Sequence, residues 1–418
     1  MINFSGRLAV MGMAFLAACG ASQHASGDRP VVTAENRLWV LAPHPDDELL
    51  IAGEAMQAAL AHHRPISVIV MTNGDLGCGR NGHARQLETL AALASIGVPE
   101  RSVHFLGYPD GYLDSLGPVP LPPVARTQQD GSCGVGDSTY ASHGAGNVDV
   151  HTLRTGAPGP YVDSGPVDDL AWLLEREPPS EIITTHGIDT HPDHAMTYAY
   201  LRRALAHASI TPRVLRAIVH QGPCWPNGTG SSPCPDATLT QGTPTPLLAP
   251  PLDAYVPTFR ITSVDGGAAK RGAISHYTTQ LDVDPSHAEQ SWLSSFARTD
   301  EVFWPEQVAP AQVTTTSRDA PFAHATIDID DAPGLQLQLE DQGVSLRHQG
   351  IVLRSMPIPH GEYAAWTHRW KVSVDHEGSI AEISVRRDDA FWMSAVIATS
   401  AAIADQVRSD GPATQTRP

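Results

Sequence analysis

Two short stretches of this sequence combine histidine and carboxylate side chains at a spacing that suits metal chemistry. In the first, His44 and Asp47 lie three residues apart, directly after an apolar run and at the start of a helical pattern. Residues i and i+3 share a face in the first turn of a helix, so the imidazole and the carboxylate should converge on one point. A catalytic zinc ion has three protein ligands and an open position for water. This stretch therefore supplies two of the three.

The third ligand is expected from the second stretch, residues 191–194, which reads His-Pro-Asp-His. Its last histidine, His194, follows an apolar segment, residues 181–185, and begins another helical pattern. Because the carboxyl ends of parallel strands share one edge of a sheet, where ligands bind, His194 should meet His44 and Asp47 there. Each motif alone is more often a helix cap or a solvent-exposed group, but the two together favour a metal site. Zinc is the first choice, and histidine–aspartate ligation also suits iron or other divalent ions.

Two further side chains beside the expected ligands complete a set for amide hydrolysis. Asp46 is a neighbour of the first pair and could accept a proton from a zinc-bound water, whose pKa is lowered to roughly 7. His191 lies one turn before His194 and could donate to the oxyanion of a tetrahedral intermediate or protonate the leaving amine. We therefore predict Asp46 as the general base and His191 as oxyanion stabiliser or acid.

The segments that position these residues alternate between strand and helix patterns. Short apolar runs, typical of strands buried on both faces, alternate with amphipathic helical segments. The runs are residues 39–42, 66–71, 103–106, 181–185 and 214–219, and the helical segments are 48–62, 83–96, 166–177, 194–206, 268–280 and 288–296. This alternation predicts an α/β fold with a mostly parallel sheet. Residues 114–165 lack periodicity, which is typical of a functional or disordered loop.

The pattern changes near residue 310. Apolar and polar residues alternate strictly in residues 335–339, 371–374 and 382–385, as in half-exposed antiparallel strands. We expect a catalytic domain, a linker, a small β-rich domain and a polar tail, over residues 37–305, 306–319, 320–408 and 409–418.

The N-terminus has the pattern of an export signal. Arg7 precedes an apolar run, residues 8–16, and Leu-Ala-Ala-Cys at residues 16–19 resembles a bacterial lipobox. We predict a signal peptide over residues 1–18, lipid on Cys19 and a tether over residues 19–36, in an exported lipoprotein of the bacterial cell envelope. An ordinary signal peptide is the alternative. The formal charge of −18 disfavours nucleic acid and anionic lipid as partners, so membrane contact is expected through the lipid anchor alone.

The remaining cysteines are candidates for disulfides. Removing Cys19 leaves an even number, Cys78, Cys133, Cys224 and Cys234, which favours disulfides in an exported protein. Of the three possible connectivities, the favoured one joins Cys224 to Cys234 across a loop and leaves Cys78 to pair with Cys133.

The two motifs resemble the paired signatures of the PIG-L/LmbE-like family of zinc N-acetylglucosaminyl deacetylases. The resemblance rests on residues 42–48 (Ala-Pro-His-Pro-Asp-Asp-Glu) and 191–194, and extends to residues 72–75, Arg85 with Glu88, and residues 106–111, 270–280 and 296–304. It implies a Rossmann-like α/β fold with helices on both faces of the sheet. It also implies zinc bound by His44, Asp47 and His194, with Asp46 and His191 in the roles given above. Arg85 and Asp110 match positions that contact the sugar in family members.

The expected function is removal of the N-acetyl group from an N-acetylglucosamine-type amino sugar or glycoconjugate outside the cytoplasm. The long segment 114–165, the export signal and the β-rich domain depart from the family's pattern. Two alternatives remain open: zinc-dependent hydrolysis of another acylated small molecule, and a lipid-anchored glycan-binding protein with a vestigial site.

Overall fold

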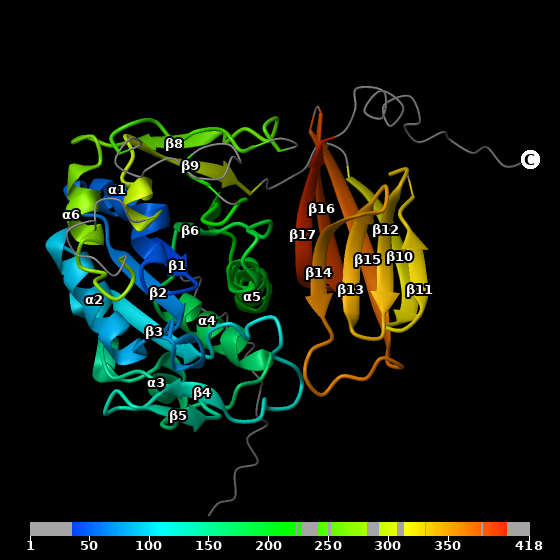
Figure 1. Cartoon of the computed structure of the whole chain (residues 1–418), viewed down its shortest axis with the longest axis horizontal. Helices are drawn as coiled ribbons and strands as arrows, with labels where there is room; N and C mark the ends of the chain where they lie inside the picture. The colour runs from blue at the N-terminus through cyan, green and yellow to red at the C-terminus, as the bar shows by residue number, and fades with distance from the viewer. Residues whose placement is uncertain are drawn as a thin grey trace, which may run out of the picture. The chain divides into compact units, whose positions relative to one another are not determined.

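A mixed β-sheet carries both histidine stretches, each at the carboxyl end of a central strand (Figure 1). The parallel strands run in the order β3 (Val103–Tyr108), β2 (Ile66–Thr72), β1 (Leu38–Ala42), β6 (Glu181–Thr185) and β7 (Arg213–Ala217). Beyond β7, the antiparallel strands β9 (Asp300–Pro305) and β8 (Phe259–Thr262) extend the sheet. The computed structural model describes residues 36–222, 224–227, 241–249, 252–281, 292–306, 313–330, 332–377 and 379–398.

Helices cover both faces of this sheet, which explains why its strands are apolar throughout. On one face lie α1 (Asp47–Ala61), α2 (Gly82–Ser95) and α6 (Ala268–Ile274), and on the other α4 (Ser164–Arg176) and α5 (Pro192–Ala208). In β1, Trp39 packs with the α4 and α5 side chains, whereas Val40 packs with those of α1 and α2. Both side chains are fully buried. The predicted α/β fold with a mostly parallel sheet is confirmed.

The segment without periodicity, residues 114–165, contains short elements that sequence patterns did not reveal. They are a hairpin of β4 (Val124–Thr127) and β5 (Cys133–Gly136) and the helix α3 (Val150–Thr155). A disulfide joins Cys133 of this hairpin to Cys78, the pairing favoured from the sequence. Cys224 is also disulfide-bonded. Its expected partner, Cys234, lies outside the described residues.

The C-terminal part is β-rich, as predicted. As far as it is described, residues 313–398 form two antiparallel sheets. One runs β10 (Val313–Pro321), β15 (Thr367–Glu377), β16 (Ile380–Arg387), β17 (Ala390–Ala398), and the other runs β11 (Ala325–Asp328), β12 (Leu335–Glu340), β13 (Gly343–His348), β14 (Ile351–Pro357). In β12 the leucines are buried and the glutamines between them are half-buried, which is the expected alternation.

The β-rich part packs against α5 of the α/β part. The ring of Tyr198 in α5 meets that of Phe391 in β17 edge to face, with centroids 5.3 Å apart. Both side chains belong to a hydrophobic cluster that also contains Leu337 of β12. The described residues after Ala34 accordingly form one compact unit. The predicted domain boundaries stay predictions, because residues 307–312 are not described.

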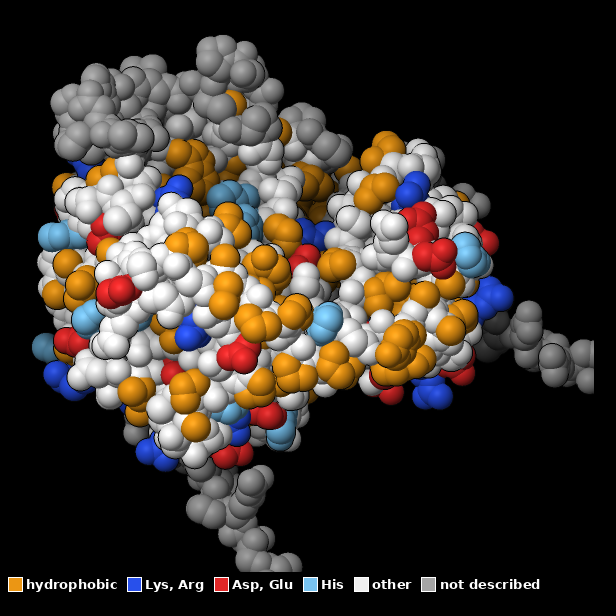
Figure 2. All heavy atoms as spheres, turned by 60° about the horizontal axis from the view of Figure 1, so that its bottom comes forward, with side chains coloured by type: hydrophobic (Ala, Val, Ile, Leu, Met, Phe, Trp, Pro, Cys, Tyr) orange, Lys and Arg blue, Asp and Glu red, His pale blue; other side chains and the backbone are white. Residues whose placement is uncertain are grey.

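Several predicted features fall outside the described residues: the signal peptide, Cys19, the tether and the polar tail. Within the described residues no helix is long and apolar enough to cross a membrane. Figure 2 shows one face of the molecule, on which acidic, basic and histidine side chains are interspersed among apolar ones rather than gathered in a field of one sign.

Candidate metal centre and active site

The first histidine stretch forms the turn between β1 and α1. β1 ends at Ala42, and α1 begins at Asp47. The backbone N–H of His44 donates to Asp47 Oδ2 over 3.1 Å, which closes the turn. Asp46 has a φ of 117°, which is strained for a residue with a side chain. Such strain costs on the order of 1–3 kcal/mol and persists where surrounding contacts enforce it, commonly at functional sites.

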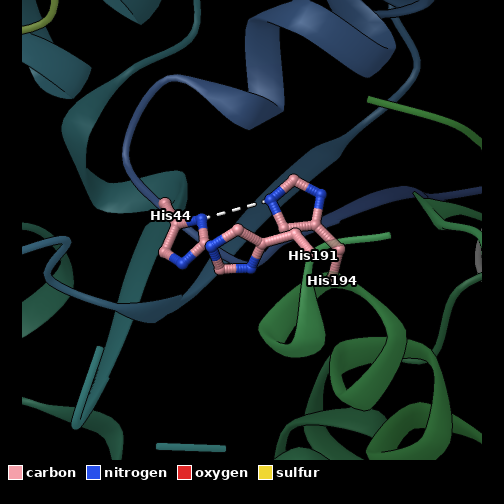
Figure 3. A group of neighbouring side chains, drawn as sticks. All are labelled: His44, His191 and His194. Carbon is pink, nitrogen blue, oxygen red and sulfur yellow. Dashed lines mark hydrogen bonds between the residues drawn. The ribbon is translucent and has the colours of Figure 1, made fainter. Parts of the chain in front are cut away.

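The second stretch begins α5 without strain. His191 caps the helix, because its Nδ1 accepts a hydrogen bond from the N–H of Asp193. Pro192 follows at the first helical position, where its missing N–H costs nothing. One turn later, His194 is fully buried and points toward the turn that holds His44 (Figure 3).

The structure brings His44, Asp47 and His194 together, as predicted. His44 Nδ1 lies 3.1 Å from Asp47 Oδ2 and 3.2 Å from His194 Nε2. The third side of this triangle, from Asp47 Oδ2 to His194 Nε2, is 3.2 Å. All three side chains are buried. A tetrahedral zinc ion with bonds of roughly 2.1 Å holds its ligand atoms about 3.4 Å apart, so this donor set fits such an ion.

Carboxylates behind the two histidines orient their free nitrogens toward the triangle. His44 Nε2 lies 3.1 Å from Asp193 Oδ2 and 3.2 Å from Asp110 Oδ1, which favours a hydrogen on Nε2 and a lone pair on Nδ1. His194 Nδ1 lies 3.3 Å from Asp189 Oδ2, although not aligned as a hydrogen bond, so its lone pair is favoured on Nε2. Two lone pairs and a carboxylate then face one another, an arrangement that a cation stabilises.

The pKa values of these groups report the same need for positive charge. Burial alone lowers the pKa of His44, but the negative charge of Asp110 and its hydrogen bonds raise it well above 6.5. Burial likewise opposes charge on His194, whose pKa is raised to about 9 by Asp47 and Asp189. Burial raises the pKa of Asp47, yet His194 and His44 bring it well below its usual value. A divalent ion would satisfy this demand when bound.

Two other groups of side chains in the described part of the chain are close enough to share an ion: His44 with His191 and His194, and His44 with Asp110 and Asp193. The carboxylates of the second group are already engaged by backbone donors. Asp193 accepts from the N–H groups of Gly111 and Leu113, and Asp110 accepts from that of Leu76. We therefore assign them to orienting His44 rather than to holding the ion.

Asp46 lies beside the triangle without belonging to it. Its Oδ2 accepts a hydrogen bond from Arg85 Nη2 over 3.0 Å. Burial is the main reason why the pKa of Asp46 is raised to about 7, against the opposing charge of Arg85 and with the help of Asp47 and Glu48. A carboxylate with a pKa near neutrality is suited to accept a proton and give it back.

His191 is suited to donate a hydrogen bond as a neutral imidazole. Burial, together with the charges of His44 and His194, lowers its pKa to about 4. Because Nδ1 accepts from the N–H of Asp193, the hydrogen of the neutral ring is on Nε2. The ring centroid lies 4.9 Å from that of each other histidine in Figure 3.

Arg85 and Asp110, the predicted sugar contacts, have structural partners here. Arg85 donates to the carbonyls of Gly74 and Pro45 in addition to Asp46, so it fixes the first turn. Gly74 has a φ of +66°, and a Cβ atom there would lie 2.0 Å from the Arg85 guanidinium. Asp110 is placed against His44. Direct contact of Arg85 or Asp110 with a sugar stays a prediction.

The structure adds two rings to the site that sequence reasoning missed. The centroid of His220 lies 4.6 Å from that of His194 and 5.3 Å from that of His191. The indole of Trp292 stacks on His220, with centroids 5.0 Å apart and planes inclined by 16°. Both side chains are half-buried. The available signal was the position of His220 just after β7, at the same sheet edge as the other histidines.

A family model matches the segment of the chain that carries this site. Residues 39–205 match the family model PIG-L, described as GlcNAc-PI de-N-acetylase. This segment contains every residue of the predicted metal, catalytic and sugar-contact sites. No curated protein sequence matches the chain.

Solved structures show distant likenesses. N,N'-diacetylchitobiose deacetylase from Pyrococcus horikoshii, complexed with its inhibitor MPG, is 14% identical, with 65% of this chain and 84% of that chain covered and a TM-score of 0.39. The zinc-inhibited form of teicoplanin deacetylase Orf2 is 17% identical, with 64% and 97% covered and a TM-score of 0.38. GalB, the 4-carboxy-2-hydroxymuconate hydratase from Pseudomonas putida KT2440, is 12% identical, with 66% and 98% covered and a TM-score of 0.37. At these TM-scores the likenesses carry no argument about the reaction. Residues 39–205, which carry the site, are therefore similar to the PIG-L family.

Proposed function

We propose that this protein is a metal-dependent N-deacetylase, with zinc as the metal, that acts on an N-acetylglucosamine-type sugar or glycoconjugate. One observation carries the proposal: donor atoms of His44, Asp47 and His194 lie 3.1–3.2 Å from one another, and Arg85 holds the carboxylate of Asp46 beside them. The family description, a de-N-acetylase of a GlcNAc conjugate, supports the choice of substrate class.

The residues divide the work of amide hydrolysis. A divalent ion held by His44, Asp47 and His194 supplies Lewis-acid activation of water and of the acetamide carbonyl when bound. Asp46 accepts a proton from the attacking water, whose oxygen joins the acetyl carbon. His191 donates its Nε2 hydrogen to the oxyanion that develops on the carbonyl oxygen. Asp46 then returns the proton to the departing nitrogen as the C–N bond breaks, which leaves acetate and a free amine.

The proposed location is outside the cytoplasm, with the protein anchored by lipid on Cys19. The disulfide between Cys78 and Cys133 supports this location, because structural disulfides persist in oxidising compartments. The substrate is then a sugar of the cell envelope or its surroundings rather than a cytosolic sugar nucleotide.

An acetate-release assay tests the function. The zinc-loaded protein is incubated with N-acetylglucosamine oligomers, peptidoglycan fragments and exopolysaccharides, with and without a chelator, and Asp46→Asn serves as the matched control. We expect acetate and free amine in equal amounts from at least one substrate, a loss of release with chelator, and recovery on adding zinc. Chelator-independent binding of a glycan without acetate release would show a glycan-binding protein instead. Release confined to acylated compounds that are not sugars would overturn the substrate class.

A further inference from the structure

The loop between β6 and α5, residues 186–191, holds both histidines of the second stretch in place. At its centre is Asp189, which is fully buried. Its Oδ1 accepts from the N–H of His191 over 3.0 Å, and its Oδ2 lies 3.3 Å from His194 Nδ1. The same Oδ2 accepts from the N–H of His220 over 3.0 Å. Asp189 therefore fixes the backbone at His191 and His220 and faces the ring of His194.

A side chain from the C-terminal β-rich part holds Asp189. Arg354 of β14 donates from Nη1 to the backbone carbonyl of Asp189 over 2.5 Å. Burial lowers the pKa of Arg354, and the negative charges of Asp189 and Asp114 partly offset that effect. Asp114 belongs to the loop after β3, which also carries Asp110. Arg354 is half-buried, and these acidic partners stabilise its charge between the two loops that orient His194 and His44.

A hydrogen-bond chain from β16 reaches the start of the same loop. His186 Nδ1 accepts from the N–H of Ile188, so Nε2 carries the hydrogen and donates to Tyr255 Oη over 2.9 Å. Tyr255 Oη then donates to Glu382 Oε2 of β16 over 3.2 Å. Glu382 is also paired with Arg216 of β7. Each donor in this chain has an acceptor, and the direction of every bond is fixed by the one before it.

The backbone of both loops also comes close to the β-rich part. A Cβ atom on Gly187 would lie 2.2 Å from Ser394 Oγ of β17, so the loop passes directly over that strand. In the loop after β3, the carbonyl of Ser115 accepts from the N–H of His360 over 3.0 Å. A Cβ atom on Gly117 would lie 1.8 Å from the His360 carbonyl oxygen.

We propose that the β-rich part completes the metal centre, and that Arg354 is a positioning residue that acts through Asp189 on His194. The sheets of residues 313–398 brace the two loops whose carboxylates orient the metal-binding histidines. The expected effect of Arg354 on turnover rests on the proposed function. Its expected effect on zinc affinity does not, because zinc binding is measured without substrate.

The test compares Arg354→Ala with Arg347→Ala in the full chain. Arg347 is a suitable control because it lies on the adjacent strand β13 and contacts Ser345 and Glu340 of its own sheet. Zinc affinity is measured by competition with a chromogenic chelator, without substrate, and thermal unfolding of the metal-free protein is followed by circular dichroism. Loss of a residue that orients a metal ligand typically costs 10–100-fold in affinity or activity. We expect a loss of that size for Arg354→Ala, a smaller one for Arg354→Lys, and none for Arg347→Ala.

The outcomes separate positioning from general stability. Native zinc affinity in a folded Arg354→Ala protein would overturn the proposal, as would an equal loss in Arg347→Ala. If Arg354→Ala does not fold, Glu382→Gln replaces it. That change keeps the shape of the side chain and weakens the hydrogen bonds that connect β16 to His186. Native zinc affinity in the Glu382→Gln protein would again overturn the proposal. A wild-type protein that binds zinc but releases no acetate would contradict the proposed function and leave the positioning role to be judged by affinity alone.

Discussion

The two strand-to-helix junctions of the site meet at the same ion position but are built differently. The junction after β1 is strained and acidic: Asp46 has a φ of 117° and a pKa raised by burial to about 7. It is held from within the α/β part, by Arg85 of α2. The junction after β6 is an unstrained helix cap with a neutral His191, and it is braced from the β-rich part through Asp189 and Arg354.

Each of the two junctions suits one kind of chemistry. A proton acceptor needs a carboxylate kept out of water, and the strained turn presents one beside two metal ligands. A neutral imidazole donates from a defined nitrogen only when its tautomer is fixed, and the helix cap fixes it through a single backbone N–H. We therefore expect substitutions at the first junction to change proton transfer, and those at the second to change stabilisation of the oxyanion.

The largest effect on turnover is expected from Asp46→Asn. Asparagine tolerates a positive φ and keeps the shape of the side chain but cannot accept the proton, so kcat should fall by roughly 10²–10⁴-fold. Zinc content, measured by atomic emission, should remain one ion per chain, because Asp46 is not a ligand. If Asp46→Asn turned over at the native rate, Asp46 would not be the general base.

His191→Gln should have the next largest effect. Removing one oxyanion donor typically costs about 10²–10³-fold in kcat, with little change in KM. Glutamine can still cap α5, so metal affinity should change little, and chelator competition checks this. If zinc affinity falls together with kcat, His191 would instead be a ligand, as the triplet of His44, His191 and His194 would allow.

In the zinc-saturated protein, the pH dependence of turnover should come from the first junction. Asp46 works in its ionised form, so kcat/KM should fall as the pH drops through its pKa, at or below about 7, since a bound cation lowers that pKa further. His191, with a pKa of about 4, stays neutral over this range. Arg85→Ala removes a charge that lowers the pKa of Asp46, so the acidic limb should move to higher pH and activity should recover in alkaline buffer. A rise in KM without any movement of the limb would favour the predicted sugar contact of Arg85 instead.

The smallest effect is expected from Trp292→Ala. The indole stacks on His220 beyond the second junction, where it can support one face of a sugar ring. Aromatic contacts of this kind contribute about 0.5–1.5 kcal/mol, so KM should rise roughly two- to tenfold while kcat is kept. Kinetics with Trp292→Phe as the control decide this, and an unchanged KM in the alanine variant would place the substrate elsewhere.

The sequence was sufficient for whatever depends on local spacing. Apolar runs and helical periodicity predicted the α/β part, because strands buried on both faces must be apolar. Spacing also predicted that three side chains would lie together at one sheet edge: His44 and Asp47 are three residues apart, and His194 follows the next central strand. The positive φ of Asp46 was not predictable, because tertiary contacts such as the Arg85 hydrogen bond enforce it.

Contacts over long separations in the chain escaped sequence reasoning for a physical reason. Arg354 reaches Asp189 across 165 positions, and nothing in the local sequence of either residue marks the pair. Short elements were missed as well: the strands of the β4–β5 hairpin have four residues each, too few for a period to be visible. The expected helix over residues 268–280 is shorter, since α6 ends at Ile274. Of the helix expected over residues 288–296, the described residues Trp292–Phe296 form a 3-10 helix.

The backbone conformation at Asp46 sets the stability of the fold against catalysis. Glycine at this position would relax the φ of 117° and remove a carboxylate whose burial opposes its charge. Selection for stability alone would therefore favour glycine at position 46. An aspartate at position 46 lowers the stability of the fold, so it should be kept only where the reaction is under selection. Among natural variants of this chain, the residue at position 46 should therefore distinguish working enzymes from proteins that keep only the shape.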